Sequence, residues 1–534
     1  MRASIWVNLS AGLTVRFRAQ SAIGPDVEEG VRDVCREIGA IVPSALLIAC
    51  LHAWHAVDAL QREGETLDPH DAPVPADSGR LPWYRGIPRY AWIVLLISAL
   101  GWLFDTMDQN LFNQVRQRSL TEIMQPAFVN AAPGMLDAAV KSWAGTLTSI
   151  FLIGWAVGGF VFGVLGDRIG RTRTMIMTIC IYAVFTGLNG LAHTPWEYAL
   201  CRFLTALGVG GEFAAGTALV AETWPQRSRA MALGALQSSS AFGNIIAALI
   251  ALTLANAGWR WAYAVGALPA LLVLWIRRNV KEPERWQQAR EHAESTGNTG
   301  ELGNIGELLG SPRWRRNTIA GVLMAAAGVG GVWGVGFFLP DLIQSAMKPT
   351  VYAFPQIAAI ADPALQKKAA GAILQAMSSK VSIIQQIGAF IGMFSFAPIS
   401  QKIGRRPAFF IFFILAFLSV QAAFYGIRDV QSAYLLALPL GICALAPFAA
   451  YAVYFPELYP TRLRSTGIGF CYNGARLVAA GAPYLLGQLA HKFAVRGDDA
   501  AGLRTAASIV ACVYVLGFIG LAFAPETKGK PLPE

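Results

Sequence analysis

Charged residues are scarce in this chain. Only 14% of its 534 residues are Asp, Glu, Lys or Arg, while 54% are hydrophobic and the mean hydropathy is +0.45. A soluble protein normally carries about a quarter of its residues as charges. So few charges cannot cover several water-facing domains, which excludes an ordinary soluble multidomain protein. The composition therefore predicts that the chain lies in a lipid bilayer.

Histidine and cysteine are also sparse, with six and seven residues. The cysteines are scattered and none forms a C-x-x-C pair, and no His/Cys/carboxylate group has metal-ligand spacing. A Walker motif, which ATP-driven transport would need, is lacking. We therefore expect no enzyme activity, no cofactor, no metal and no ATP. The net charge of +10 follows the membrane topology described next, so nucleic acid is not an expected partner.

Long apolar runs recur from Tyr90 onward, each near the ~20 residues that span hydrocarbon. They predict twelve transmembrane helices, at residues 90–113, 143–165, 173–192, 196–222, 231–256, 260–278, 317–344, 378–400, 407–426, 431–455, 465–490 and 504–524. Basic residues gather in the turns after spans two, four, eight and ten, and in the long link after span six. This bias predicts a multi-pass protein of the cell membrane, with both ends of the twelve-helix core in the cytoplasm.

The two halves of the chain repeat each other. The octapeptide from Glu222 to Arg229 recurs from Glu457 to Arg464, 235 residues later, and Gly170-Arg171 recurs as Gly404-Arg405. Two short matches at nearly one offset indicate duplication. The predicted fold is therefore an all-α integral membrane protein of two six-helix pseudo-repeats, with a substrate site between them near mid-membrane.

The domain boundaries follow from the spans. Residues 1–88 form an N-terminal extension of unassigned role, in which the apolar stretch from Ile38 to Val57 could be an extra or an interfacial helix. We expect six-helix bundles at residues 89–278 and 317–525, a cytoplasmic central linker at 279–316, and a cytoplasmic tail at 526–534.

The end of the second span resembles the signature loop of the major facilitator superfamily. It reads Gly163-Val-Leu-Gly-Asp167-Arg168-Ile-Gly170-Arg171-Thr-Arg173. The segments starting at Lys281, Phe455 and Pro525 resemble motifs of the sugar-porter branch and its metabolite:proton relatives. The resemblance covers residues 89–530 and implies a secondary transporter that works by alternating access.

The same resemblance implies a set of gating residues. They are Gly163, Asp167, Arg168, Gly170, Arg171, Glu222, Arg229, Arg405, Glu457 and Arg464. The second copy of the loop departs from the pattern, since Gln401 stands in place of the aspartate and Ala397 in place of the first glycine. We therefore expect a weaker gating contact at the second copy of the loop. Span seven also lacks the amides with which sugar porters hold sugar hydroxyls, which favours organic acids over hexoses.

Ionisable residues inside the spans are costly and usually have a task or a partner. Asp105 and Asp108 share one face of span one, and span four carries Arg202 and Glu212. These four are the candidates for proton coupling. The resemblance places Arg202 opposite Asp105, so that protonation of the aspartate would release the arginine. A permanent salt bridge is the structural alternative.

Span eleven offers Arg476 one turn after Tyr472, a planar donor fork suited to a substrate carboxylate. An ion pair with Asp341 or Glu212 is the alternative. The other candidate substrate contacts are amides, for which hydrogen bonds between helices are equally expected: Gln109, Gln237, Asn244, Gln385, Gln386 and Asn473.

These observations favour proton-coupled symport of a small organic anion, with a small-molecule substrate and protons as the partners. A proton-coupled symporter of a sugar or polyol is the first alternative, supported by Gln237 and the tail motifs. A membrane sensor that does not transport is the second, and its only support is the long N-terminal extension.

Overall fold

The computed structural model describes residues 3–9, 13–19, 82–128, 135–253, 258–334, 336, 339–479, 481, 485–486, 489, 492–493 and 501–533. The chain divides into two compact units, residues 1–78 and 79–534. In the first, β1 (Ala3–Leu9) pairs antiparallel with β2 (Leu13–Ala19), a hairpin that the sequence analysis did not predict. The apolar stretch from Ile38 to Val57 lies outside the described residues.

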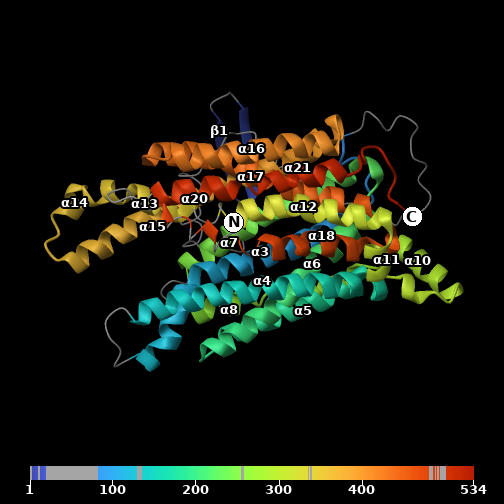
Figure 1. Cartoon of the computed structure of the whole chain (residues 1–534), viewed down its shortest axis with the longest axis horizontal. Helices are drawn as coiled ribbons and strands as arrows, with labels where there is room; N and C mark the ends of the chain where they lie inside the picture. Colours follow the sequence, from blue (N-terminus) through green and yellow to red (C-terminus); the bar gives the residue numbers. More distant parts are fainter. Residues whose placement is uncertain are drawn as a thin grey trace. The chain divides into compact units, whose positions relative to one another are not determined.

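The second unit is helical throughout its described part (Figure 1). Its first half contains α3 (Arg89–Met124), α4 (Met135–Ile169), α5 (Arg171–Asn189), α6 (Pro195–Thr223), α7 (Gln226–Thr253), α8 (Trp259–Gly266) and α9 (Ala270–Asn279). The linker forms α10 (Glu284–Ser295) and α11 (Ile305–Gly310). The second half contains α12 (Pro312–Gly334), α13 (Leu339–Tyr352), α14 (Pro355–Ala358), α15 (Pro363–Ile403), α16 (Arg405–Gly426), α17 (Val430–Leu458), α18 (Arg464–Ala479), α20 (Ala501–Ala511) and α21 (Tyr514–Phe523).

Where its residues are described, each of the twelve predicted spans overlaps one helix or two consecutive helices. Within the described residues, eight helices are long and apolar enough to cross a membrane. The predicted ends differ most at α15, whose 41 residues correspond to about 61 Å, twice the ~30 Å of hydrocarbon. Hydropathy reports only the part of a helix that suits lipid, so it missed the first fifteen residues of this one. The predicted span seven, 317–344, covers most of α12 and the first turn of α13.

The repeat in the sequence reappears in the helix packing. Gly158 on α4 lies so close to α6 that an added Cβ would be 2.1 Å from the carbonyl oxygen of Leu207. Gly392 on α15 approaches the carbonyl oxygen of Ile442 on α17 in the same way, also at 2.1 Å. The two pairs are equivalent positions of the two halves. Glycine at both positions therefore allows a close helix contact within each half.

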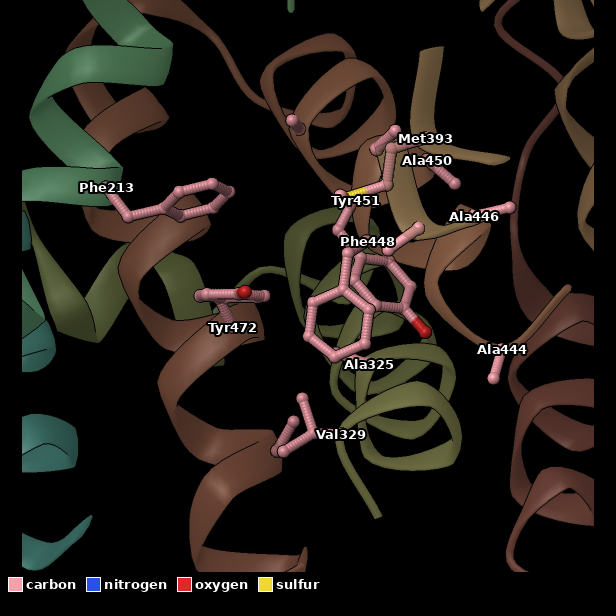
Figure 2. Packing of buried hydrophobic residues seen from close by; sticks show 14 of the residues in the cluster. Phe213, Ala325, Val329, Met393, Ala444, Ala446, Phe448, Ala450, Tyr451 and Tyr472 are labelled. Atoms are coloured by element: carbon pink, nitrogen blue, oxygen red, sulfur yellow. The ribbon is translucent and has the colours of Figure 1, made fainter. Parts of the chain in front are cut away.

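The two halves meet along α4 with α18 and along α7 with α15. Figure 2 shows part of this interface, where the ring of Phe213 on α6 lies against that of Tyr472 on α18. The two rings are stacked with centroids 4.3 Å apart. Phe448 and Tyr451 of α17 approach Tyr472 from the other side, each at 6.3 Å. These aromatic contacts hold Tyr472 beside the cavity described next.

Candidate substrate cavity and gate

A cavity of about 140 Å³ lies between the two halves. Helices α3, α4 and α7 of the first half and α12, α15, α17 and α18 of the second contribute its walls. The lining residues are Trp102, Thr106, Gln109, Asn110, Asn113, Trp155, Gln237, Ser240, Asn244, Val332, Trp333, Gln386, Met393, Leu445, Phe448, Tyr472 and Arg476. The walls are thus aromatic rings and amides, with one cation.

That cation, Arg476, is buried, with 3% of its surface exposed. Its Nη1 donates to Asn473 Oδ1 at 2.6 Å and to the carbonyl oxygen of Tyr472 at 3.2 Å. Its guanidinium carbon lies 3.9 Å from the ring centre of Trp155 and 4.2 Å from that of Tyr472. No described carboxylate forms an ion pair with it, and its Nε has no hydrogen-bond partner. Arg476 is therefore a cation that its neighbours fix in position, and its Nε–H group remains available as a hydrogen-bond donor.

The amides named from the sequence take different places. Gln109, Gln237, Asn244 and Gln386 line the cavity, and Asn244 donates to Gln386 Oε1 at 3.2 Å, which joins the two halves. Gln385 is buried but does not line the cavity. Asn473 also lies outside the lining, where it accepts the hydrogen bond from Arg476 and so orients it.

Asp105 and Glu212 form a pair of buried acids behind the cavity wall. Their carboxyl groups interact electrostatically with each other. The Glu212 carboxyl rests against Gly101, where an added Cβ would be 1.6 Å from Oε1. None of their four oxygens accepts a hydrogen bond from another described residue. Asp105 also interacts electrostatically with Arg476.

The predicted pairing of Arg202 with Asp105 is wrong. Arg202 Nη1 instead lies 3.0 Å from Asp108 Oδ2, and both side chains are fully buried. Thr186 donates to the other oxygen of Asp108 at 2.7 Å. The guanidinium also lies between the rings of Phe112 and Phe151, at 4.4 and 4.2 Å. One turn of α3 thus separates the Asp108–Arg202 ion pair from Asp105, whose oxygens accept no hydrogen bond from another described residue.

At the end of the bundle that carries the basic loops, Asp167 joins the two halves. Its carboxylate accepts hydrogen bonds from the backbone N–H groups of Ser465 and Thr466, at 3.1 and 2.8 Å, and from Thr466 Oγ1 at 2.6 Å. These donors form the first turn of α18, where an anion is stabilised by the helix dipole. Gly163 permits the approach, because its added Cβ would be 3.1 Å from the carbonyl oxygen of Ser465.

Glu222 completes this contact. It accepts two hydrogen bonds from Arg171, at 3.0 and 3.1 Å, and one from Arg464 of the other half at 2.7 Å. Arg171 also pairs with Asp167 at 3.1 Å. We call these four residues, Asp167, Arg171, Glu222 and Arg464, the gate cluster.

The equivalent position of the second half is simpler. Arg405 pairs with Glu457 at 2.8 Å, which repeats the pair of Arg171 with Glu222. Gln401, however, makes one hydrogen bond of 3.4 Å to the carbonyl oxygen of Arg227. Arg229 is buried, and its Nε lacks a hydrogen-bond partner among the described residues. The gate cluster of the first half therefore provides more of the contact between the halves.

The linker and the tail cover the gate cluster. Arg168 donates to the carbonyl oxygen of Leu302, and Trp286 of α10 donates to that of Asp167 at 2.7 Å. Gly170, at φ +113°, turns the chain so that Glu282 can accept the N–H groups of Thr172 and Arg173. In the tail, Glu526 accepts those of Arg405 and Arg406.

The sequence analysis missed the aromatic walls of the cavity. Trp102, Trp155 and Trp333 all line it, but a tryptophan in an apolar run is indistinguishable by hydropathy from one that packs in a core. Asn113 was also missed. Its spacing of four residues from Gln109 on α3 was the available signal.

The comparisons with known proteins agree with this architecture. Residues 118–379 match the family model described as Major Facilitator Superfamily. The chain belongs to the major facilitator superfamily. It is accordingly a transporter rather than an enzyme. The fold is similar to that of the proton:xylose symporter XylE from E. coli, with a TM-score of 0.64, 20% identity, and coverage of 83% of this chain and 98% of that one.

Two known proteins are similar to this chain in sequence. A putative metabolite transport protein of Haemophilus influenzae is 28% identical over 83% of this chain and 98% of its own length. The cis,cis-muconate transport protein of Acinetobacter baylyi is 29% identical over 65% of this chain and 78% of its own length.

Proposed function

We propose that this transporter couples the movement of a small organic carboxylate to that of a proton. The observation that carries the proposal is Arg476, a buried cation at the cavity without an ionic partner among the described residues. Keeping such a charge away from water is costly unless an anion completes the pair. A substrate carboxylate would do so during binding. The similarity to a muconate transport protein supports the same class of substrate.

The Asp105–Glu212 pair is the proposed proton site. Two buried carboxyl groups that interact electrostatically cannot both carry charge easily. A proton shared between them would remove negative charge that otherwise attracts Arg476, and so would favour binding of the substrate anion. Protonation of the acid pair and binding of the substrate would then be coupled through Arg476. The Asp108–Arg202 pair, already neutral as a unit, would serve to hold α3 against α6.

The gate cluster is the proposed cytoplasmic lock. With Asp167 bound to the first turn of α18 and Glu222 bound to Arg464, the two halves are held together at that end. Opening there would require these cross-half contacts to break, in line with alternating access.

The test uses purified protein in liposomes that contain a pH-sensitive dye. Benzoate, muconate, glucose and xylitol are each added outside, and proton uptake is recorded. A carboxylate should carry protons inward, whereas the neutral compounds should not. Arg476→Lys keeps the charge but loses the planar fork, and should weaken carboxylate affinity by about 1–3 kcal/mol, or about 5- to 150-fold.

Arg504→Lys is the matched control, since Arg504 binds backbone carbonyl groups outside the cavity. In addition, Asp105→Asn should abolish uphill accumulation but retain exchange of substrate across the membrane. Proton uptake driven by glucose or xylitol, with no effect of Arg476→Lys, would favour the sugar or polyol alternative, for which the cavity amides are suited.

A further inference from the structure

Unpartnered donors outnumber unpartnered acceptors in the cavity wall. Among the lining residues, the buried atoms without a hydrogen-bond partner are Trp102 Nε1, Trp155 Nε1, Gln109 Nε2, Arg476 Nε and one acceptor, Gln237 Oε1. Trp102 and Trp155 are each only 3% exposed. A ligand that matches this wall is rich in acceptors and poor in donors. A polyol does not fit that description, because each of its hydroxyl groups also donates.

The same wall presents aromatic rings next to the cation. Trp155 of α4 lies beneath the guanidinium of Arg476, and its ring meets that of Trp333 edge-to-face at 6.1 Å and 85°. The ring centre of Tyr472 lies 4.2 Å from the carbon of the same guanidinium. The cavity, at about 140 Å³, is smaller than the 300–1,000 Å³ of drug-sized sites. A ligand that fits this cavity is therefore small and would lie in contact with the rings.

We infer that the substrate is a flat, unsaturated carboxylate, such as an aromatic or dienoic acid. Its carboxylate would accept from Arg476 and from an indole N–H, while its π system would lie against Trp155 and Trp333. This inference rests on the proposed function and narrows it. A π system gains energy against indole rings beyond the burial of its area, and a saturated chain of equal size does not.

The test compares matched pairs of acids by isothermal titration of the purified transporter. The pairs are benzoate with cyclohexanecarboxylate, and muconate with adipate; benzamide serves as the uncharged analogue of benzoate. The unsaturated acid of each pair should bind about 2- to 12-fold more tightly, which is the gain expected from an aromatic contact. Benzamide should bind more weakly than benzoate, because it brings no charge to Arg476.

Trp155→Leu should remove the preference within each pair. Trp155→Phe keeps a ring and should retain the preference while weakening both acids, since it lacks the indole N–H. Trp143→Leu is the matched control on the same helix, because Trp143 packs against Trp196 and not in the cavity; its preference should equal that of the parent. Should Trp155→Leu fail to fold, the parent and Trp155→Phe still decide the result.

Equal binding of saturated and unsaturated acids, with proton uptake intact, would overturn the inference and leave the proposed function standing. Failure of all four acids to bind would also overturn it. Binding of benzamide or glucose in place of the acids would overturn both.

Discussion

Asp167→Asn is the sharpest test of the gate cluster. The substitution keeps the size of the side chain but removes its charge and one of its acceptor oxygens. Three hydrogen bonds from the first turn of α18 and the ion pair with Arg171 at 3.1 Å are affected. Both partners of that ion pair are fully buried. Only the hydrogen bonds to α18 cross between the halves, because Arg171 lies in the same half as Asp167 and keeps Glu222 as a partner. A hydrogen bond to a charged group contributes about 1.5–3 kcal/mol, so the balance between closed and open forms should shift by about 12- to 150-fold.

The chain supplies its own control in the second half. Gln401 stands at the position equivalent to Asp167 and makes one hydrogen bond of 3.4 Å. Gln401→Ala should therefore cost about 0.5 kcal/mol, near the lower limit for a hydrogen bond, and shift the balance about twofold.

Spin labels at positions 173 and 402, both exposed in the structure, report the separation of the two halves at this end. Double electron–electron resonance in a cysteine-free background should show a short distance between the two labels for the parent and for Gln401→Ala. Asp167→Asn should show a longer one. A distance distribution for Asp167→Asn that matches the parent would refute the assignment of Asp167 as part of the lock.

Two further predictions concern stability. Partial burial alone would raise the pKa of Glu526, but hydrogen bonds from four backbone N–H groups lower it below the ordinary 4.5. A lowered pKa stabilises the folded state above the unfolded pKa, so Glu526→Gln should reduce Tm at pH 7. The difference in Tm should begin to shrink as the pH falls below about 4.5 and should be lost once the pH has fallen through the lowered pKa of the folded state. An equal difference at pH 3.5 and 7 would contradict this. Asp108→Asn should lower the free energy of unfolding by about 3–5 kcal/mol, because it leaves Arg202 buried without its partner. A second change, Arg202→Gln, should restore part of the lost Tm. An Asp108→Asn variant as stable as the parent would show that the pair contributes nothing to stability.

Much of the architecture could be predicted because it depends on local properties of the sequence. Each span is an apolar run of the length that hydrocarbon requires, and the duplication is visible as two short matches at nearly one offset. The structure adds two equivalences at offsets of 234 and 235 residues: the Gly158 and Gly392 packing contacts, and the capping boxes of Thr194 and Asp429. Helix ends were predicted less well, as α15 shows, because a helix can continue into water after its apolar part ends.

The sequence by itself determined that this chain spans the membrane in two similar halves, and which loop carries the superfamily motif. Only the tertiary structure decided which acid pairs with Arg202. Asp105 and Asp108 lie one turn apart on α3, and the sequence cannot tell how far α6 is rotated or shifted against it. The same holds for Trp155, whose place at the cavity depends on how α4 meets α18. Apolarity shows that a side chain avoids water, whereas the packing of helices decides whether it faces lipid, a core or a substrate.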